Sequence, residues 1–359
     1  MESAASRLTY AAAQTARVAF YGAHYLAARV IARNAFSGIE KPAHPIPSLT
    51  TMLKSMQTLF ARDWRNVEAG LYPMPLNLTD EMRRATASLR YLTDVPRVAA
   101  RQKRRGHSDL GTKGEGLPRY FRQNFHFQTD GYLSDDSAKL YDFQVEALFG
   151  GTADAMRRRA YVPIARFLEA CGTRSITLLD IGCGTGRFLK FTKSLQPKLK
   201  TIALDLSEPY LERARKNLKS ERGVRFIAAP AEEMPLPDGS VDVAVSIFLF
   251  HELPPKIRAG AAREIGRVLK PGGIFVLADS IQYGDAPDFD GLIDIFPTLL
   301  HEPYYAGFAK CDLDALFAKA GLAREATDVA YMTKIAVFRK ERVRRPVRRA
   351  KTSGRGADA

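Results

Sequence analysis

The chain has 359 residues, of which 46% are hydrophobic and 26% charged, values typical of a globular protein larger than one average domain. Its three cysteines, Cys171, Cys183 and Cys311, lie far apart and have none of the paired spacings that hold zinc, so the sequence predicts no metal site and fits a reducing, cytoplasmic location. The formal net charge of +15 points to nucleic acid, yet residues 339–359 alone carry nine Lys and Arg residues against two acids. We therefore expect a basic, disordered tail at residues 340–359 and disfavour nucleic acid as a partner.

The first third of the chain predicts a helical extension over residues 1–101. Residues 102–133 are expected to form a linker and an aromatic-rich lead-in, because four glycines interrupt residues 102–118. No apolar run is long enough for a membrane span. Residues 1–36 are nevertheless rich in Ala and Arg with Glu2 as their only acid, so peripheral membrane contact or targeting to an organelle stays an alternative.

Residues 134–339 predict a doubly wound α/β domain. Ser134 followed by Asp135 and Asp136 indicates a helix start, and Gly150 and Gly151 indicate its end. Beyond Gly172, short apolar runs alternate with helical patterns. These runs are residues 176–181, 201–206, 224–228, 241–247 and 274–278, with one or two closing strands expected within 329–338. Such alternation is typical of βαβ units around a parallel sheet.

A glycine-rich segment follows the first of these strands and reads Asp180-Ile181-Gly182-Cys183-Gly184-Thr185-Gly186. Glycines at this turn let the backbone approach a ligand that a Cβ atom would exclude. A dinucleotide loop would read G-x-G-x-x-G, whereas the third glycine comes one residue earlier here. The segment resembles motif I of class I S-adenosyl-L-methionine-dependent methyltransferases.

The resemblance extends to the ubiquinone/menaquinone C-methyltransferase-like, or type 11, group over residues 141–338. It implies a seven-stranded, mostly parallel, Rossmann-like sheet whose last strand is antiparallel, and S-adenosyl-L-methionine as the cofactor. Asp205 at the end of the second strand is expected to accept hydrogen bonds from both ribose hydroxyls. Pro230 stands where many relatives have an Asp that binds adenine, so Ala231 and Glu232 are expected to replace that contact. The implied cofactor-binding residues are Tyr141, Asp180, Gly182, Cys183, Gly184, Gly186, Asp205, Leu206, Ala231, Glu232 and Ser246.

For the acceptor, the sequence favours a small molecule, lipophilic or planar, because aromatic residues follow strands four and five. The predicted acceptor pocket consists of Phe248, His251, Tyr304 and Tyr305. His251 is interpreted as the general base, with hydrogen bonding within its own loop as the alternative. Glu252 is expected at the surface.

Two other functions stay open. The basic balance and the run Arg157-Arg158-Arg159 would suit a nucleic-acid or protein methyltransferase, although the run is more simply a solvated helix face. The Asn/Asp-Pro-Pro-Tyr-like turn of many amino-methyltransferases is absent after strand four. A cofactor-binding scaffold that has lost its chemistry is the non-enzymatic alternative.

Overall fold

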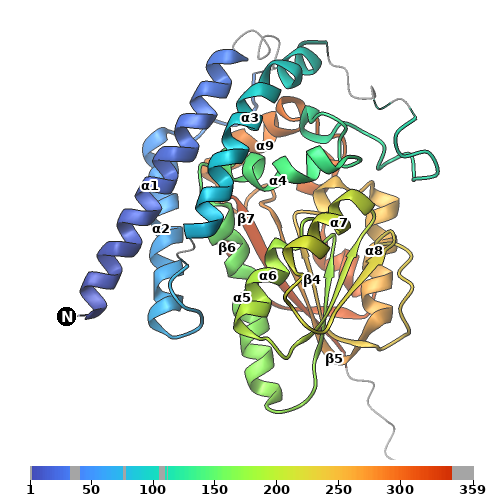
Figure 1. Cartoon of the computed structure of the whole chain (residues 1–359). Coiled ribbons are helices and arrows are strands. Elements are labelled where there is room, and N and C mark those ends of the chain that lie inside the picture. The colour runs from blue at the N-terminus through green and yellow to red at the C-terminus, as the bar shows by residue number, and fades with distance from the viewer. Residues whose placement is uncertain (1, 33–40, 76–77, 105–109, 111, 342–359) are drawn as a thin grey trace, which may run out of the picture.

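A computed structural model of the chain (Figure 1) describes residues 2–32, 41–75, 78–104, 110 and 112–341. Most of the predicted basic tail and residues 105–109 and 111 of the predicted linker lie outside the described residues. The centre of the fold is a seven-stranded sheet in the order β3-β2-β1-β4-β5-β7-β6. Its strands are β1 (Thr177–Ile181), β2 (Lys200–Asp205), β3 (Val224–Ala228), β4 (Val241–Ile247), β5 (Leu269–Ser280), β6 (Leu322–Ala330) and β7 (Thr333–Lys340). β7 alone runs antiparallel to its neighbours β5 and β6, which confirms the predicted sheet.

The central strands are buried on both faces, because helices cover each side of the sheet. In β4, Val243 and Val245 belong to one apolar cluster and Ala244 to another. Phe275 of β5, next to Ala244 in the register, lies in that second cluster. Alternate residues of one strand thus fill two cores, which explains why these strands read as continuous apolar runs in the sequence.

Eight helices of the described chain accompany the sheet. They are α4 (Asp135–Leu148), α5 (Ala153–Cys171), α6 (Arg187–Leu195), α7 (Glu208–Asn217), α8 (Pro255–Val268), α9 (Asp290–Leu299), α10 (Tyr305–Ala309) and α11 (Leu313–Ala318). Short 3-10 turns are η1 (Phe125–Phe127), η2 (Phe250–Glu252) and η3 (Pro287–Phe289). The Ser134 hydroxyl accepts a hydrogen bond from the backbone N–H of Ser137 at 3.1 Å, so the helix start predicted there is confirmed.

The first third of the chain forms α1 (Glu2–Ile31), α2 (Leu49–Glu68) and α3 (Leu78–Arg104), which lie against α4 and α5 (Figure 1). The helix α3 continues past the predicted boundary at residue 101. A buried carboxylate joins these helices to the sheet domain: Asp63 of α2 makes two hydrogen bonds with the Arg158 guanidinium of α5 and accepts one from each of Tyr10 and Tyr72.

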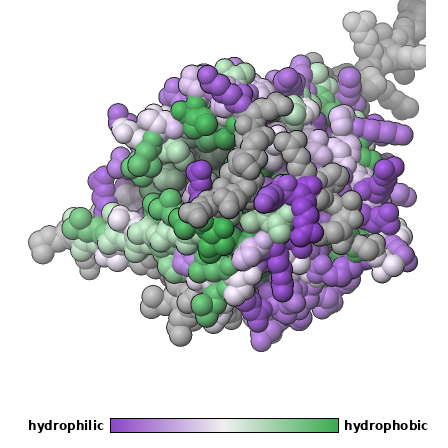
Figure 2. Space-filling model, turned by 90° about the horizontal axis from the view of Figure 1, so that it is seen from above, coloured by the Kyte–Doolittle hydropathy of each residue, from purple (hydrophilic) through white to green (hydrophobic). Residues whose placement is uncertain are grey.

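Several large hydrophobic side chains of α1 are exposed, among them Leu8, Leu26 and Val30. Seen from above, hydrophobic and hydrophilic areas lie side by side on the molecule (Figure 2). Within the described residues, none of the helices combines the length and apolar character that a membrane crossing requires.

The last predicted strand region differs from the structure. β6 begins at Leu322, well before residue 329, and includes charged residues such as Arg324 and Glu325. β6 is an edge strand with one neighbour, so its outer residues face solvent and its sequence lacks the apolar run of a central strand.

Candidate cofactor and acceptor site

The glycine-rich segment connects β1 to α6 and adopts backbone angles that favour glycine. Gly182, Gly184 and Gly186 have φ of +70°, +54° and +73°. A Cβ at Gly186 would lie 2.9 Å from Leu218 and 3.1 Å from Ala214, so this glycine lets α6 pack closely on α7. A Cβ at Gly184 would meet no protein atom within 4 Å, and Gly184 lines a cleft. The open side of Gly184 is therefore a surface that a ligand can approach closely.

Asp205 ends β2 directly beside this loop. Its Oδ2 accepts the backbone N–H of Gly184 at 2.7 Å, and its Oδ1 accepts that of Ser207 at 2.8 Å. Burial raises the pKa of Asp205 to about 6, Glu252 adds to the rise, and the two backbone donors oppose it. These two N–H groups fix the carboxylate in place and leave further lone pairs for a ligand.

The cleft in front of the loop, called here the glycine-loop cleft, contains seven of the predicted residues. It is lined by Tyr141, Gly182, Gly184, Asp205, Leu206, Ala231 and Phe248. Four aromatic residues also line it that sequence reasoning missed, Tyr120, Phe121, Tyr132 and Tyr210. Three of these four come from residues 120–132, predicted only as a lead-in, so the aromatic content of that segment was the available signal.

Other predicted cofactor residues lie behind the cleft wall or beside it. Asp180 is 1% exposed, and burial, then Asp205, raises its pKa to about 8. Cys183 and Ser246 are also buried. Glu232 does not line the glycine-loop cleft, because its carboxylate accepts the Tyr120 hydroxyl at 2.8 Å. Of the residues Ala231 and Glu232, expected to replace the adenine contact, the structure places only Ala231 at the cleft.

His251 lies in η2, next to the carboxyl ends of β4 and β5. Its Nδ1 is 2.5 Å from Oδ1 of Asp279, and Asp279 also accepts the backbone N–H groups of Phe250 and Ser280. Burial, the largest influence, lowers the pKa of His251, but Asp279 together with Glu302 and Glu252 raises it to about 9. At neutral pH the imidazole is therefore mostly protonated, in contrast to the near-neutral pKa expected from sequence, and its Nε2 lies 3.9 Å from Oε1 of Glu252.

The remaining predicted acceptor residues, Phe248, Tyr304 and Tyr305, do not lie together in one pocket. Phe248 lines the glycine-loop cleft with φ +56° and stacks on Phe149. Tyr305 is 2% exposed, with its ring 5.9 Å from that of His251, so it is a core residue beside the imidazole. The Tyr304 hydroxyl accepts a hydrogen bond from Gln123 at 2.6 Å. Neither Tyr304 nor Tyr305 lines the glycine-loop cleft.

A second cavity, of about 150 Å³, lies between the N-terminal helices and α4, and we call it the helical cavity. Its walls are mostly apolar and come from residues within 25–32 at the end of α1, 91–102 of α3, 126–128, 141–148 of α4 and 299–300. Tyr141 lines both the helical cavity and the glycine-loop cleft. The two spaces are therefore neighbours that share one tyrosine.

Three titratable side chains meet where the two spaces adjoin, and we call them the histidine–carboxylate cluster: His126, Glu252 and Glu302. The Nε2 atom of His126 lies 3.2 Å from Glu302 and 3.8 Å from Glu252. Glu252 lines the glycine-loop cleft and its side chain is only 11% exposed, so the surface position expected for it was wrong. His126 lines the helical cavity, and its φ of +56° is uncommon for a residue with a side chain.

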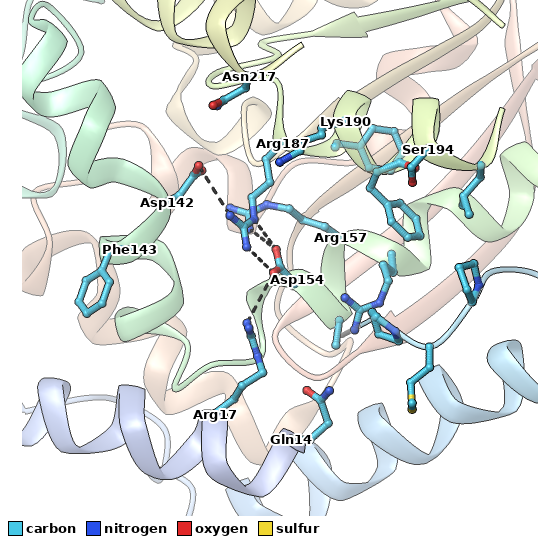
Figure 3. A pocket seen from close by; sticks show the side chains of 18 of the residues that line it. Gln14, Arg17, Asp142, Phe143, Asp154, Arg157, Arg187, Lys190, Ser194 and Asn217 are labelled. Carbon is cyan, nitrogen blue, oxygen red and sulfur yellow. Dashed lines mark hydrogen bonds and ion pairs between the residues drawn. The ribbon is translucent and has the colours of Figure 1, made fainter. Parts of the chain in front are cut away.

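The prediction that residues 157–159 form a solvated helix face was also wrong. Arg157 and Arg158 are 7% and 8% exposed, and Arg159 pairs with Asp328. Arg157 belongs to a network behind the glycine loop in which Arg17, Arg187 and Asp154 also take part (Figure 3). These arginines join α1, α5 and α6 by ion pairs, so their positive charge is neutralised within the fold.

Comparison with known proteins identifies the family of the sheet domain. Residues 179–277 match the family model described as "Methyltransferase domain". The chain contains a class I methyltransferase domain. Its cofactor is S-adenosyl-L-methionine.

Two curated relatives show how this methyltransferase domain varies. A "Ubiquinone/menaquinone biosynthesis C-methyltransferase UbiE" of Methylobacterium nodulans is 30% identical over 162 residues, 44% of this chain and 62% of the relative. A "tRNA (carboxymethyluridine(34)-5-O)-methyltransferase" of Arabidopsis thaliana is 36% identical over 115 residues, 32% of this chain and 26% of the relative. The chain thus spans less than two thirds of the length of each relative.

One solved structure resembles nearly the whole chain. The CurJ carbon methyltransferase aligns with 93% of this chain and 98% of its own, with a TM-score of 0.51 and 15% identity. At that identity the likeness shows the fold alone. Because the alignment covers 93% of this chain, the likeness in fold extends beyond the sheet domain into the N-terminal helices.

Proposed function

We propose that the whole chain transfers the methyl group of S-adenosyl-L-methionine to a small lipophilic molecule. The observation that carries this proposal is the adjoining of two spaces at Tyr141, the glycine-loop cleft and the mostly apolar helical cavity. The cleft suits the cofactor, and the cavity suits an apolar acceptor of modest size. The N-terminal helices contribute the cavity wall, which gives the first third of the chain a role in acceptor binding.

The sulfonium methyl is already activated, so the protein's main tasks are to align donor and acceptor and to exclude water. An acceptor carbon, phenol or thiol must also lose a proton. We propose that the neutral form of His251, whose share grows as the pH rises towards 9, is the base, with Asp279 holding Nδ1 so that Nε2 can accept the proton. The electron pair of the methyl–sulfur bond passes to sulfur, which leaves a neutral thioether.

Substitution of the proposed base tests the mechanism. His251→Ala should lower kcat by at least about 100-fold and leave cofactor affinity unchanged, because His251 does not line the glycine-loop cleft. Asp279→Asn is the companion variant: it keeps a hydrogen-bonding group but removes the charge that stabilises the imidazolium. A His251→Ala protein with full kcat would end the proposal for this residue.

A macromolecular acceptor is the second candidate, favoured by the relative that carries a tRNA methyltransferase name. Incubation of the chain with cell extract and methyl-labelled cofactor separates the possibilities. Label in a small lipophilic fraction supports our proposal, and label in RNA or protein supports the alternative. No transfer to any fraction, with cofactor binding intact, indicates a scaffold that has lost its chemistry.

We also propose a cytoplasmic location, consistent with three cysteines that form no disulfide. Fractionation of cells that express the tagged chain tests this placement, and recovery with membranes or an organelle would contradict it.

A further inference from the structure

The histidine–carboxylate cluster joins residues that are distant in sequence. His126 comes from η1, Glu252 from η2 and Glu302 from the turn after α9. One ligand atom from each, the histidine ring nitrogen or a carboxylate oxygen, lies within 4.8 Å of the other two. The cysteine spacings predict no metal site, and these three residues lie 126 and 50 positions apart, too far to form a local ligand motif.

Glu302 is the observation that points to a ligand. Its side chain is 0% exposed, and within the described part of the chain neither carboxylate oxygen has a hydrogen-bond donor. The Nε2 atom of His126 lies 3.2 Å from Oε1, and this ring is charged only when it is protonated. Burying a carboxylate without donors is costly, and a bound cation is one way to offset that cost.

The donor set also suits a metal ion. Two ligands at 2.1 Å from one tetrahedral ion lie about 3.4 Å apart, close to the 3.2 Å and 3.8 Å that separate the His126 Nε2 atom from the two glutamates. The Tyr132 hydroxyl donates to Oε1 of Glu252 at 2.6 Å, a contact of the kind that orients a metal ligand. We propose that His126, Glu252 and Glu302 bind one divalent ion of the Mn²⁺, Fe²⁺ or Zn²⁺ type, because imidazole and carboxylate ligands suit these ions.

The position of the ion gives it a role, and this step rests on the proposed function. Glu252 lines the glycine-loop cleft and His126 lines the helical cavity, so the ion lies between donor and acceptor. With three protein ligands it keeps a position for an acceptor oxygen and acts on it as a Lewis acid. The acceptor class is then a lipophilic enolisable carbonyl compound or phenol. Its proton passes to His251, and the resulting carbon or oxygen nucleophile takes the methyl group.

Metal binding can be measured without any acceptor. The full-length chain is stripped with a chelator and titrated with Mn²⁺, and the electron paramagnetic resonance signal of free Mn²⁺ is followed, with Zn²⁺ and Fe²⁺ as competitors. We expect one ion per chain. His126→Gln and Glu302→Gln should each weaken binding by at least about 100-fold, because changes outside the ligand shell alone cost about 10- to 100-fold.

A matched control is His44→Gln, since His44 also faces a carboxylate, that of Asp294 at 3.1 Å, but lies outside the cluster. This variant should bind the ion normally. His126 is partly exposed, so its replacement tests the site even where the buried Glu302→Gln protein does not fold. No ion binding, or equal binding by the His126→Gln and control proteins, overturns the proposal.

Separate calorimetry with S-adenosyl-L-methionine keeps the two proposals distinguishable. A chain that binds the cofactor but none of the three ions refutes the metal site and leaves the proposed function standing. A chain that binds the ion but not the cofactor refutes the proposed function and leaves the site. Full methyl transfer by the stripped protein, in the presence of chelator, refutes the Lewis-acid role.

Discussion

Asp205→Asn is the substitution that most directly tests the glycine-loop cleft. Each carboxylate oxygen already accepts one backbone N–H, from Gly184 at 2.7 Å and from Ser207 at 2.8 Å. The neutral amide of Asn removes the charged acceptor from both ribose hydroxyls, and in either orientation its NH₂ group is turned towards one of these backbone donors. A hydrogen bond to a charged group contributes about 1.5–3 kcal/mol, so the Kd for the cofactor should rise by about 10- to 150-fold.

Isothermal titration calorimetry with S-adenosyl-L-methionine measures this change. Asp328→Asn is the matched control, because Asp328 is a carboxylate that pairs with Arg159 and does not line the cleft. The control should keep the wild-type Kd, and thermal unfolding should show that both variants are folded. A folded Asp205→Asn protein with unchanged Kd would refute our reading of the cleft.

Three further predictions follow from the geometry. Gly184→Ala and Gly186→Ala should both lower the melting temperature because both glycines have positive φ, and Gly186→Ala should lower it more because only its Cβ meets protein atoms; Gly184→Ala should in addition weaken cofactor binding, and calorimetry and thermal unfolding of both proteins check this. Because the pKa of Asp205 is raised to about 6 and the cofactor favours the carboxylate, affinity should be half-lost near pH 6, full about one pH unit above it, and fall further below it; a Kd constant from pH 5 to 8 would contradict this. Asp63→Asn leaves the Arg158 charge buried and should cost about 3–5 kcal/mol in urea unfolding. Burial raises the pKa of Asp63, but Arg158 lowers it more, so the pKa lies below its ordinary value of 3.8. The stability that Asp63 contributes is therefore present above pH 4 and is lost as the pH falls further. The free energy of unfolding of the Asp63→Asn protein should accordingly change less between pH 4 and lower pH than that of the wild type.

Much of the sheet domain could be predicted from the sequence, because its signals are local. The apolar runs of β1, β2 and β4, the Ser134 helix cap and the glycine loop each depend on neighbouring residues. Asp205 was predictable because it follows a strand at a fixed distance from that loop. β6 was not fully predicted, because an edge strand exposes one side and carries charged residues.

The parts that local patterns missed depend on contacts between distant segments. His126 and Glu302 meet although 176 positions separate them, and no sequence period marks such a pair. Arg158 resembles a surface residue until Asp63, 95 residues earlier, is placed beside it. The helical cavity likewise forms only where α1, α3 and α4 meet, so the sequence of any one of these helices does not indicate that it lines a cavity.

The position of Tyr141 has a thermodynamic consequence. A ring that forms part of two adjoining binding spaces can take only one position at a time, so a ligand that moves it on one side changes the other side as well. If the cofactor alters the affinity for the acceptor by some factor, the acceptor must alter that for the cofactor by the same factor. Order of addition and cooperativity in this protein should then be traceable to a single side chain.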